Sequence, residues 1–367
     1  MCGIAGWIDW ENRLEDPVNQ ETLTAMIDTL KMRGPDDSGR YVCPNIAFGH
    51  RRLSVVDPAN GAQPMIKRRN GHNYVITYNG ELYNTNELRA ELEGYGYHFE
   101  TNCDTEVLLT AYMEFGTKCV EKLNGIFAFG IWDAAKERLF LARDRIGVKP
   151  LFYAIRDCQF IFGSEVKTLL ANPLIKPEVN IEGLAEILMV GPARTPGNGV
   201  FKNVFELKPG HAFVYTATGS RNYRYWALMS HAHEDNFETT VQKVRELLID
   251  TAQRQLVADV DVCTFLSGGL DSSALTALAA MEFQRSGKGK LNTYSVDYID
   301  NDIYFKASSF QPNSDAPWVE KMVKACDTCH HRILIDNIEL AKSLPKATLA
   351  RDFPGMADVD TSLYLFS

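Results

Sequence analysis

Short apolar runs separated by turn residues dominate the first 160 residues or so. These runs predict β-strands at 3–8, 46–48, 74–78, 126–132, 138–142 and 160–162. Between them, the stretches 20–32, 86–94 and 105–115 favour helices, and Asp104 offers an oxygen-bearing cap for the last one. Because strands group with strands and helices stand apart, the pattern predicts an α+β layered domain.

The pattern changes in the second half of the chain. Residues 190–235 are rich in turn formers, so we expect the first domain to end there. A helical stretch at 239–255 then precedes an apolar run at 260–266, a Gly-rich loop, a helical stretch at 274–283 and a strand-like run at 292–298. This order predicts the start of a parallel α/β sheet. The expected domains are 2–215 and 235–367.

Composition narrows the class of protein. With 367 residues, two domains are more natural than one. The 38 basic and 47 acidic side chains leave a net charge of −9, which gives no electrostatic reason to expect nucleic acid or a membrane as partner. No secretory signal precedes the eight scattered cysteines. We therefore expect a cytoplasmic protein with free thiols.

Cys2 is the first candidate for chemistry. Removal of Met1 would leave a thiol and a free α-amine on one residue, and such an amine has a pKa near ~8. One residue would then supply both nucleophile and base. A cysteine at position 2 is on its own more simply explained by chance.

Further motifs change that balance. In chain order they are Cys2-Gly-Ile-Ala-Gly6, Arg33-Gly-Pro-Asp36, Gly49-His-Arg-Arg-Leu-Ser-Val-Val-Asp57, Asn79-Gly-Glu-Leu-Tyr-Asn84, Asp104-Thr-Glu106, Gly125-Ile-Phe-Ala-Phe129 and Arg143-Asp-Arg-Ile-Gly-Val-Lys-Pro-Leu151. This series resembles the class II glutamine amidotransferases of the N-terminal nucleophile hydrolase superfamily, and most of all the glutamine-hydrolysing asparagine synthetases. The resemblance implies a four-layer αββα sandwich with Cys2 as catalytic nucleophile.

The resemblance also implies a glutamine pocket. Arg52 would hold the α-carboxylate, and the α-ammonium would be held by Asp104 with help from Glu81. Asn79 and the Gly80 N–H would form the oxyanion hole. The wall would consist of Leu53, Ser54, Val55 and Val56.

Two simpler explanations stay open for these residues. Asn-Gly is the dipeptide most typical of a hairpin turn, which Asn79 and Gly80 could form while presenting their N–H groups outward. Arg52 could form a surface salt bridge, although adjacent Arg51 is better suited to that role.

The segment Ser267-Gly-Gly-Leu-Asp-Ser-Ser273 follows an apolar strand and precedes a helix. Exposed backbone N–H groups and a helix N-terminus there favour phosphate. The segment resembles the pyrophosphate loop of ATP-pyrophosphatases, so the second domain is expected to be adenine nucleotide alpha hydrolase-like. The implied ATP-binding residues are Leu266, Ser267, Gly268, Gly269, Asp271, Ser272 and Val296, with Mg²⁺ at Asp271. A Gly-Gly turn with a capped helix is the simpler alternative.

The segment Cys326-Asp-Thr-Cys329-His330 matches the pattern for covalent c-type haem. We expect neither haem nor zinc there, since no export signal and no further ligands accompany it. Synthetases of the family that this chain resembles have a second loop, of Ser-Gly-acid-Gly type, well after the first, and no such motif occurs after Ser273. The sequence also stops within an apolar run. We therefore expect a fragment or a truncated product.

The resemblance implies the conversion of ATP, aspartate and glutamine to asparagine, glutamate, AMP and pyrophosphate. Amidation of another carboxylate, such as a cell-wall or secondary-metabolite acid, and a glutaminase-only fragment are the alternatives. A non-catalytic regulatory protein is a third, which intact Cys2, Asn79 and Asp104 disfavour. A homodimer is compatible with the resemblance.

Overall fold

The computed structural model describes residues 1–309 and 312–366. The chain forms two compact units, Met1–Ser230 and His231–Ser367. None of the described helices is long and apolar enough to cross a membrane.

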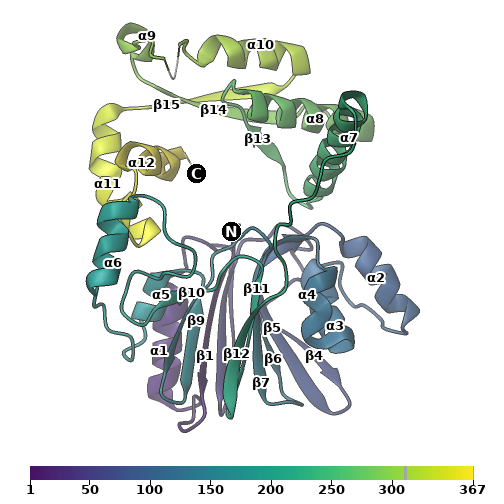
Figure 1. The fold of residues 1–367 in the computed structure, drawn as a ribbon, viewed down its shortest axis with the longest axis vertical. Helices are drawn as coiled ribbons and strands as arrows, with labels where there is room; N and C mark the ends of the chain where they lie inside the picture. The colour runs from purple at the N-terminus through teal and green to yellow at the C-terminus, as the bar shows by residue number, and fades with distance from the viewer. Residues whose placement is uncertain (310–311, 367) are drawn as a thin grey trace. The chain divides into compact units, whose positions relative to one another are not determined.

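The first unit contains two six-stranded antiparallel sheets (Figure 1). The first sheet has the spatial order β10 (Phe205–Glu206), β8 (Phe152–Arg156), β9 (Gln159–Gly163), β1 (Gly3–Asp9), β3 (Ile46–Arg52) and β2 (Asp37–Cys43). The second sheet has the order β12 (Gly219–Arg224), β11 (His211–Thr216), β7 (Arg138–Arg143), β6 (Gly125–Asp133), β5 (His72–Leu82) and β4 (Met65–Arg69).

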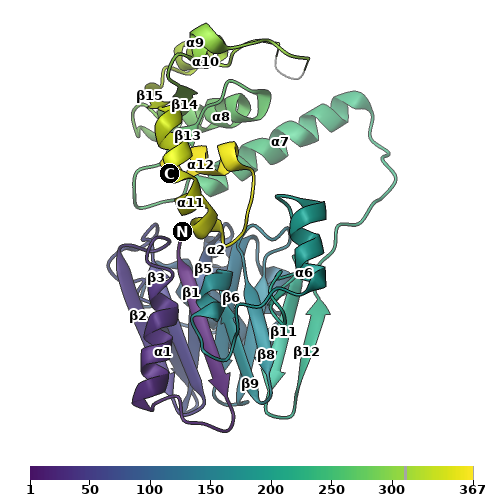
Figure 2. The same ribbon diagram turned by 90° about the vertical axis from the view of Figure 1, so that its left-hand side faces the viewer.

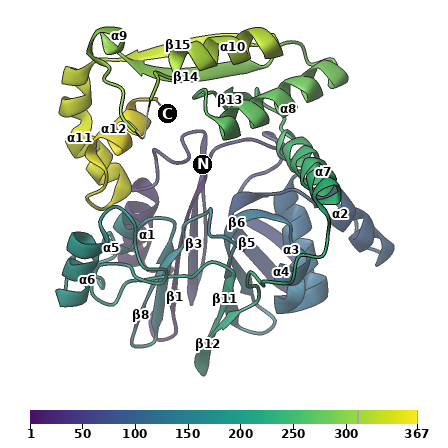
Figure 3. The ribbon, with the colours of Figure 1, turned by 45° about the horizontal axis from the view of Figure 1, so that its top comes forward.

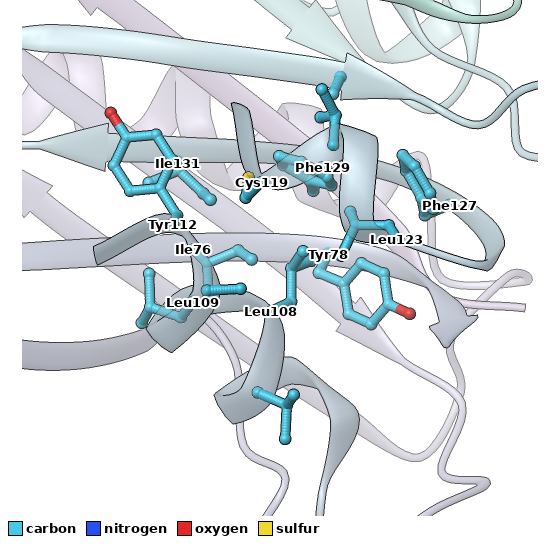
Figure 4. Close-up of a cluster of buried hydrophobic side chains, with 14 of the residues drawn as sticks. Ile76, Tyr78, Leu108, Leu109, Tyr112, Cys119, Leu123, Phe127, Phe129 and Ile131 are labelled. Atoms are coloured by element: carbon cyan, nitrogen blue, oxygen red, sulfur yellow. The ribbon is translucent and has the colours of Figure 1, made fainter. Parts of the chain in front are cut away.

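Alternating side chains of β5 show how the layers stack. Val75 packs with Ile4 and Phe160 of the first sheet, which places one face of β5 in the core between the sheets. Ile76 packs instead with Leu108 of the neighbouring helix layer, as Figure 4 shows. A strand whose residues are apolar in succession is thereby buried on both faces.

Helices cover the outer face of each sheet, which gives the expected αββα order. Figure 2 shows α1 (Pro17–Asp28) lying along the first sheet. The second sheet is covered by α3 (Asp104–Phe115), against which α2 (Thr85–Gly94) packs. The remaining helical segments of this unit are η1 (Gly116–Lys118), α4 (Cys119–Lys122), α5 (Val166–Leu170), α6 (Ile181–Ala185) and η2 (Glu186–Val190).

One local expectation is wrong. Asp104 does not cap α3: Cys103 precedes the helix, and the Asp104 carboxylate accepts hydrogen bonds from the Tyr78 hydroxyl and the Leu82 N–H instead. The turn-rich segment 190–235 contains the end of the first unit, Ser230, but it also forms regular strands. It supplies β11 and β12, which extend the second sheet beyond β7.

The second unit contains a three-stranded parallel sheet, as its strand–loop–helix–strand pattern predicts (Figure 3). Its strands are β13 (Cys263–Phe265), β14 (Asn292–Tyr298) and β15 (Cys329–Ile335). Its helices are α7 (Phe237–Gln255), α8 (Leu270–Ser286), α9 (Asn301–Tyr304), α10 (Ala316–Cys326), α11 (Asn337–Arg351) and α12 (Ala357–Phe366). Helices α8 and α10 pack against each other.

Candidate active site

A pocket of about 100 Å³ lies in the first unit. It gathers residues from the chain start, β5, the start of α3 and two loops. Its lining is Met1, Cys2, Arg52, Leu53, Val55, Val56, Gly61, Gln63, Tyr78, Asn79, Gly80, Glu81, Cys103, Asp104, Thr105 and Lys149. Among the residues predicted for glutamine, Ser54 is absent from the lining, and its N–H donates to Asp36 Oδ2 at 2.8 Å.

Cys2 is held in this pocket through backbone groups. Its Sγ lies 3.5 Å from the Leu53 carbonyl oxygen and 3.4 Å from the Leu53 nitrogen, which donates to it. Arg33 Nε donates to the Cys2 carbonyl at 3.0 Å, and Arg33 is itself fixed by Glu165 at 2.9 Å. Burial raises the pKa of the Cys2 thiol and lowers that of the Met1 amine beside it.

Asn79 brings an unused donor to the pocket. Its side chain is 1% exposed, and its Nδ2 has no hydrogen-bond partner in the part of the chain that the structure describes. Such an orphaned amide is unfavourable by about 1–3 kcal/mol, so buried donors normally find a partner. An unsatisfied donor facing a pocket is therefore available to a ligand oxygen.

Asn79 and Gly80 do not form a hairpin turn. Both lie inside β5, opposite Ala128 and Phe127 of β6. A Cβ on Gly80 would stand 2.4 Å from the Ile126 carbonyl oxygen, so the strands leave room for glycine alone. The hairpin between β4 and β5 turns at Asn70-Gly71, where φ is 50° and 82°.

The edge of β5 also directs the Gly80 N–H. The Tyr78 N–H donates to Gln63 Oε1 at 2.7 Å and the Leu82 N–H donates to Asp104 Oδ2 at 3.0 Å. Backbone groups of alternate residues point to the same edge of a strand. The Gly80 N–H therefore points toward the pocket side, between Gln63 and Asp104.

Asp104 places a carboxylate opposite this edge. Its Oδ2 accepts from the Tyr78 hydroxyl at 2.8 Å as well as from Leu82. Burial raises the pKa of Asp104, while these hydrogen bonds and Glu81 act on it as lesser influences of both signs. A cation entering the pocket would offset that unfavourable burial.

Arg52 contributes a cation to the lining of the same pocket. It is 6% exposed and donates to the carbonyl oxygens of Pro58, Asp57 and Val56 at 2.7, 2.7 and 3.2 Å. It is thus no surface salt bridge. Arg51 forms one instead, with Asp28 at 2.7 Å, as the sequence suggested.

A second pocket, of about 590 Å³, lies in the second unit. Leu266, Ser267 and Val296 line it, at the carboxyl ends of β13 and within β14. The Leu266 N–H donates to the Tyr294 carbonyl at 2.8 Å, which ties the loop to the sheet. The carboxyl ends of parallel strands are where α/β sheets place ligands.

The loop after Leu266 leads directly into α8. Gly268 has φ of 80°, a left-handed conformation that favours glycine. Ser267 and Ser272 hydroxyls lie 3.0 Å apart across the loop, and Ser272 donates to the Gly269 carbonyl at 3.2 Å. Gly268, Gly269, Asp271 and Ser272 are not among the lining residues of the pocket; they form the loop and the first turn beside Ser267.

Comparison with known proteins agrees with this geometry. The model of the glutamine amidotransferase domain family matches residues 1–226, and that of the asparagine synthase family matches residues 243–367. Asparagine synthetase [glutamine-hydrolyzing] 3 of Bacillus subtilis is 52% identical over 366 residues, which cover 100% of this chain. The chain belongs to the glutamine-hydrolysing asparagine synthetase family.

The chain spans 59% of the length of that asparagine synthetase relative. The putative asparagine synthetase [glutamine-hydrolyzing] 2 of Methanocaldococcus jannaschii is 32% identical over 96% of this chain and 68% of its own length. Among solved structures, the glutamine phosphoribosylpyrophosphate amidotransferase of B. subtilis aligns with 99% of this chain and 92% of its own, at 15% identity and a TM-score of 0.48. That likeness is too weak to indicate function.

The asparagine synthetase motifs left several pocket residues unassigned. Gln63 is 8% exposed and bonds both backbone groups of Tyr78, while Thr105 accepts from Gln63 Nε2 at 3.4 Å. Lys149 is 6% exposed and lines the same pocket. The sequence signal for Lys149 is its place inside the Arg143–Leu151 motif, and Thr105 lies within the Asp104–Glu106 motif, whereas Gln63 lies in no motif.

The Cys-x-x-Cys-His segment forms ordinary contacts. His330 bonds the Thr293 and Ser295 hydroxyls at 2.9 and 3.0 Å, and Cys329 is exposed. In residues 1–309 and 312–366, no cluster of three or more His, Cys, Asp or Glu side chains is arranged to hold a metal ion.

Proposed function

We propose that the first unit hydrolyses glutamine, with Cys2 as nucleophile after removal of Met1. The observation that carries this proposal is the buried Asn79 amide, which has no hydrogen-bond partner among the described residues and lies in the pocket that also contains the Cys2 thiol. A buried N–H donor without a protein partner is suited to stabilise a substrate oxygen that becomes negatively charged during the reaction.

The proposed step transfers the thiol proton to the Cys2 α-amine while Sγ bonds the side-chain carbonyl carbon of glutamine. The carbonyl oxygen becomes an oxyanion, which the Asn79 amide and the Gly80 N–H stabilise. Collapse of this intermediate breaks the C–N bond, and the nitrogen leaves as ammonia with the proton from the amine. Water then cleaves the thioester, giving glutamate and restoring the thiol.

Two charged groups suit the ends of the substrate. A guanidinium has five N–H donors, and three bonds to loop carbonyls leave Arg52 further donors for an α-carboxylate. Asp104, with Glu81 nearby, would hold the α-ammonium. Leu53, Val55 and Val56 complete the wall.

For the second unit we propose ATP as the ligand, by analogy with its asparagine synthetase relatives. Leu266 and Val296 would flank the adenine, and the loop with Ser267, Gly268, Gly269 and Ser272 would hold phosphate. Asp271 lies in the first turn of α8, where its carboxylate would help to hold a Mg²⁺ ion that offsets the negative charge of the phosphates. In the whole enzyme, the aspartate β-carboxylate would attack the α-phosphate of ATP and release pyrophosphate, and ammonia would then displace AMP from β-aspartyl-AMP to give asparagine.

The test is direct. Intact mass would establish whether Met1 is lost, and a diazoketone analogue of glutamine should label Cys2. The purified protein should release glutamate from glutamine, and Cys2→Ala should abolish both results. Labelling of another cysteine, or full activity of Cys2→Ala, would refute the assignment. ATP binding is tested separately by calorimetry with Mg²⁺, comparing Asp271→Asn with the unchanged chain.

A further inference from the structure

The Arg143–Leu151 motif has no part in the reaction described so far, although its loop is unusually well anchored. Asp144 is 0% exposed, and its carboxylate accepts from the backbone N–H groups of Phe127, Ile146, Val148 and Lys149 at 3.2, 3.2, 2.9 and 2.9 Å. Four N–H bonds to one buried carboxylate fix the path of the loop.

Arg143 also fixes this loop, because its guanidinium donates to backbone carbonyl groups of the loop. Its guanidinium donates to the carbonyl oxygens of Lys149, Leu207 and Gly147 at 2.7, 2.7 and 2.9 Å. Both the N–H and the C=O of Lys149 are thereby held by buried charged side chains. The backbone of Lys149 is therefore held in a fixed position.

The Lys149 side chain lies in the pocket that contains Cys2. Lys149 lines the pocket with Cys2 and Glu81, and it is 6% exposed. In the described part of the chain, its ammonium group has neither an ion pair nor a hydrogen bond. Lysine is almost never buried without a partner, because its charge loses hydration, and burial does lower the pKa of Lys149. Such an unfavourable placement points to a role in function.

Other charges face Cys2 from several elements. Arg33 follows α1 and is engaged by Glu165 and the Cys2 carbonyl, and Arg52 at the end of β3 is engaged by its three carbonyls. The acidic groups are Asp36, Glu81 on β5 and Asp104 on α3. Arg33 is paired with Glu165, whereas Arg52 bonds only neutral carbonyl oxygens, so the Arg52 charge acts on Cys2 together with that of Lys149.

A fixed positive charge has a definite effect on the amine and thiol of Cys2. With two protons the pair carries charge +1, and with one proton it carries no net charge, whichever group holds that proton. A nearby cation disfavours the first form. The form with one proton is the one that can attack glutamine.

We propose that Lys149 is a positioning residue of the glutaminase site, whose ammonium group favours the singly protonated amine–thiol pair of Cys2 and so makes it reactive near neutral pH. This inference rests on the proposed glutaminase function. It assigns Lys149 an action through Cys2, with no bond to the substrate.

The experiment compares Lys149→Met and Lys149→Arg with the unchanged chain. The acid limb of the glutaminase kcat/KM profile should move to higher pH by on the order of one unit in Lys149→Met, and Lys149→Arg should restore it. Lys122→Met, on an exposed lysine paired with Glu91, is the matched control and should leave the profile unchanged. Lys149→Gln serves as a second neutral variant should Lys149→Met misfold.

A second readout separates this proposal from the proposed function. The rate at which iodoacetamide alkylates Cys2, followed by mass spectrometry across pH, needs no glutamine turnover and should shift in the same direction. If the unchanged chain releases no glutamate, the glutaminase proposal fails while alkylation still decides the effect of Lys149. An unmoved acid limb and an unmoved alkylation profile in both neutral variants would overturn the inference, as would equal loss in Lys149→Arg.

Discussion

The unsatisfied amide nitrogen of Asn79 gives the most specific test at the scale of single residues. Asn79→Ala removes the proposed oxyanion donor, so kcat for glutamine should fall about 10²–10³-fold while KM changes little. Because Nδ2 has no protein partner among the described residues, the thermal midpoint should not fall through loss of a hydrogen bond to it. Asn73→Ala, on the same strand but outside the pocket, is the control. A large rise in KM with unchanged kcat would contradict the assignment.

Asp104 allows a test in which stability and binding move apart. Asp104→Asn keeps an oxygen for Tyr78 and Leu82 but removes the charge, so glutamine binding should weaken by about 2–5 kcal/mol. Glutamine KM and direct binding measure this loss. Unchanged binding would show that the α-ammonium lies elsewhere.

The pH dependence of stability follows from the same carboxylate. Its folded-state pKa is raised by burial above the unfolded value, so its contribution is favourable at low pH and is lost as pH rises through the folded pKa. Asp104→Asn should therefore unfold at higher temperature than the unchanged chain at pH 7, with a smaller difference near pH 4. Melting curves at the two pH values test the sign, and a larger difference at pH 4 would reverse it.

Arg52 is a less clean target than the sequence suggested. Its guanidinium holds the carbonyls of Val56, Asp57 and Pro58, so Arg52→Ala would release a pocket wall as well as a substrate charge. The effect on glutamine use would then mix binding with loop disorder. The motif does not show that Arg52 would hold the loop as well as the substrate, because the contacts with the loop depend on how the loop folds back over the side chain.

At the scale of elements, the close passage of β5 and β6 explains the glycine in the Asn79-Gly80 motif. Gly80→Ala would bring Cβ within 2.4 Å of the Ile126 carbonyl oxygen and 2.8 Å of the Phe127 Cα, so the strands must separate. The free energy of unfolding should fall by about 1–3 kcal/mol, and glutaminase activity should fall with it. Gly94→Ala meets nothing within 4 Å at the end of α2 and should be neutral or slightly stabilising. Denaturant unfolding of both variants makes the comparison, and equal effects would refute the packing argument.

The apolar pattern predicts strands that are buried on both faces, such as β1 and β6, and it also predicts some elements that are less buried. Strand β14 occupies the expected 292–298, and α2 and α3 begin within one residue of their predicted starts. Strands β2, β4, β10 and β12 escape prediction because they lie at sheet edges, where exposed positions break the apolar pattern. Helix α1 begins at Pro17, earlier than expected, since proline suits the first helical turn. Interior strands β8 and β11 were missed as well; each follows a proline-containing turn.

The candidate site likewise contains residues that the motifs predict and residues that they do not. Residues whose chemistry is implied by the motifs, such as Cys2, Asn79 and Asp104, do come together in one pocket. Gln63 and Lys149 belong to the same pocket through long-range folding, because one bonds the edge of β5 and the other is delivered by a loop after β7. Chain order gives no measure of that proximity. The roles of all these residues stay predictions until the variants are measured.

At the scale of the whole molecule, every residue that lines the pocket around Cys2 lies between Met1 and Lys149, within the unit Met1–Ser230. That unit has its own core between two complete sheets, with β11 and β12 as its last strands. A unit with its own core and site should fold without the rest of the chain. We therefore predict that residues 1–230, expressed alone, unfold cooperatively and release glutamate from glutamine with a KM within a few-fold of that of the whole chain. Circular dichroism and a coupled glutamate assay on both proteins test this, with Cys2→Ala of residues 1–230 as the blank. A folded but inactive piece would mean that His231–Ser367 contributes to the glutaminase site. An unfolded piece would mean that the two sheets depend on the second unit for stability, and either result would contradict the division of labour proposed for the two units.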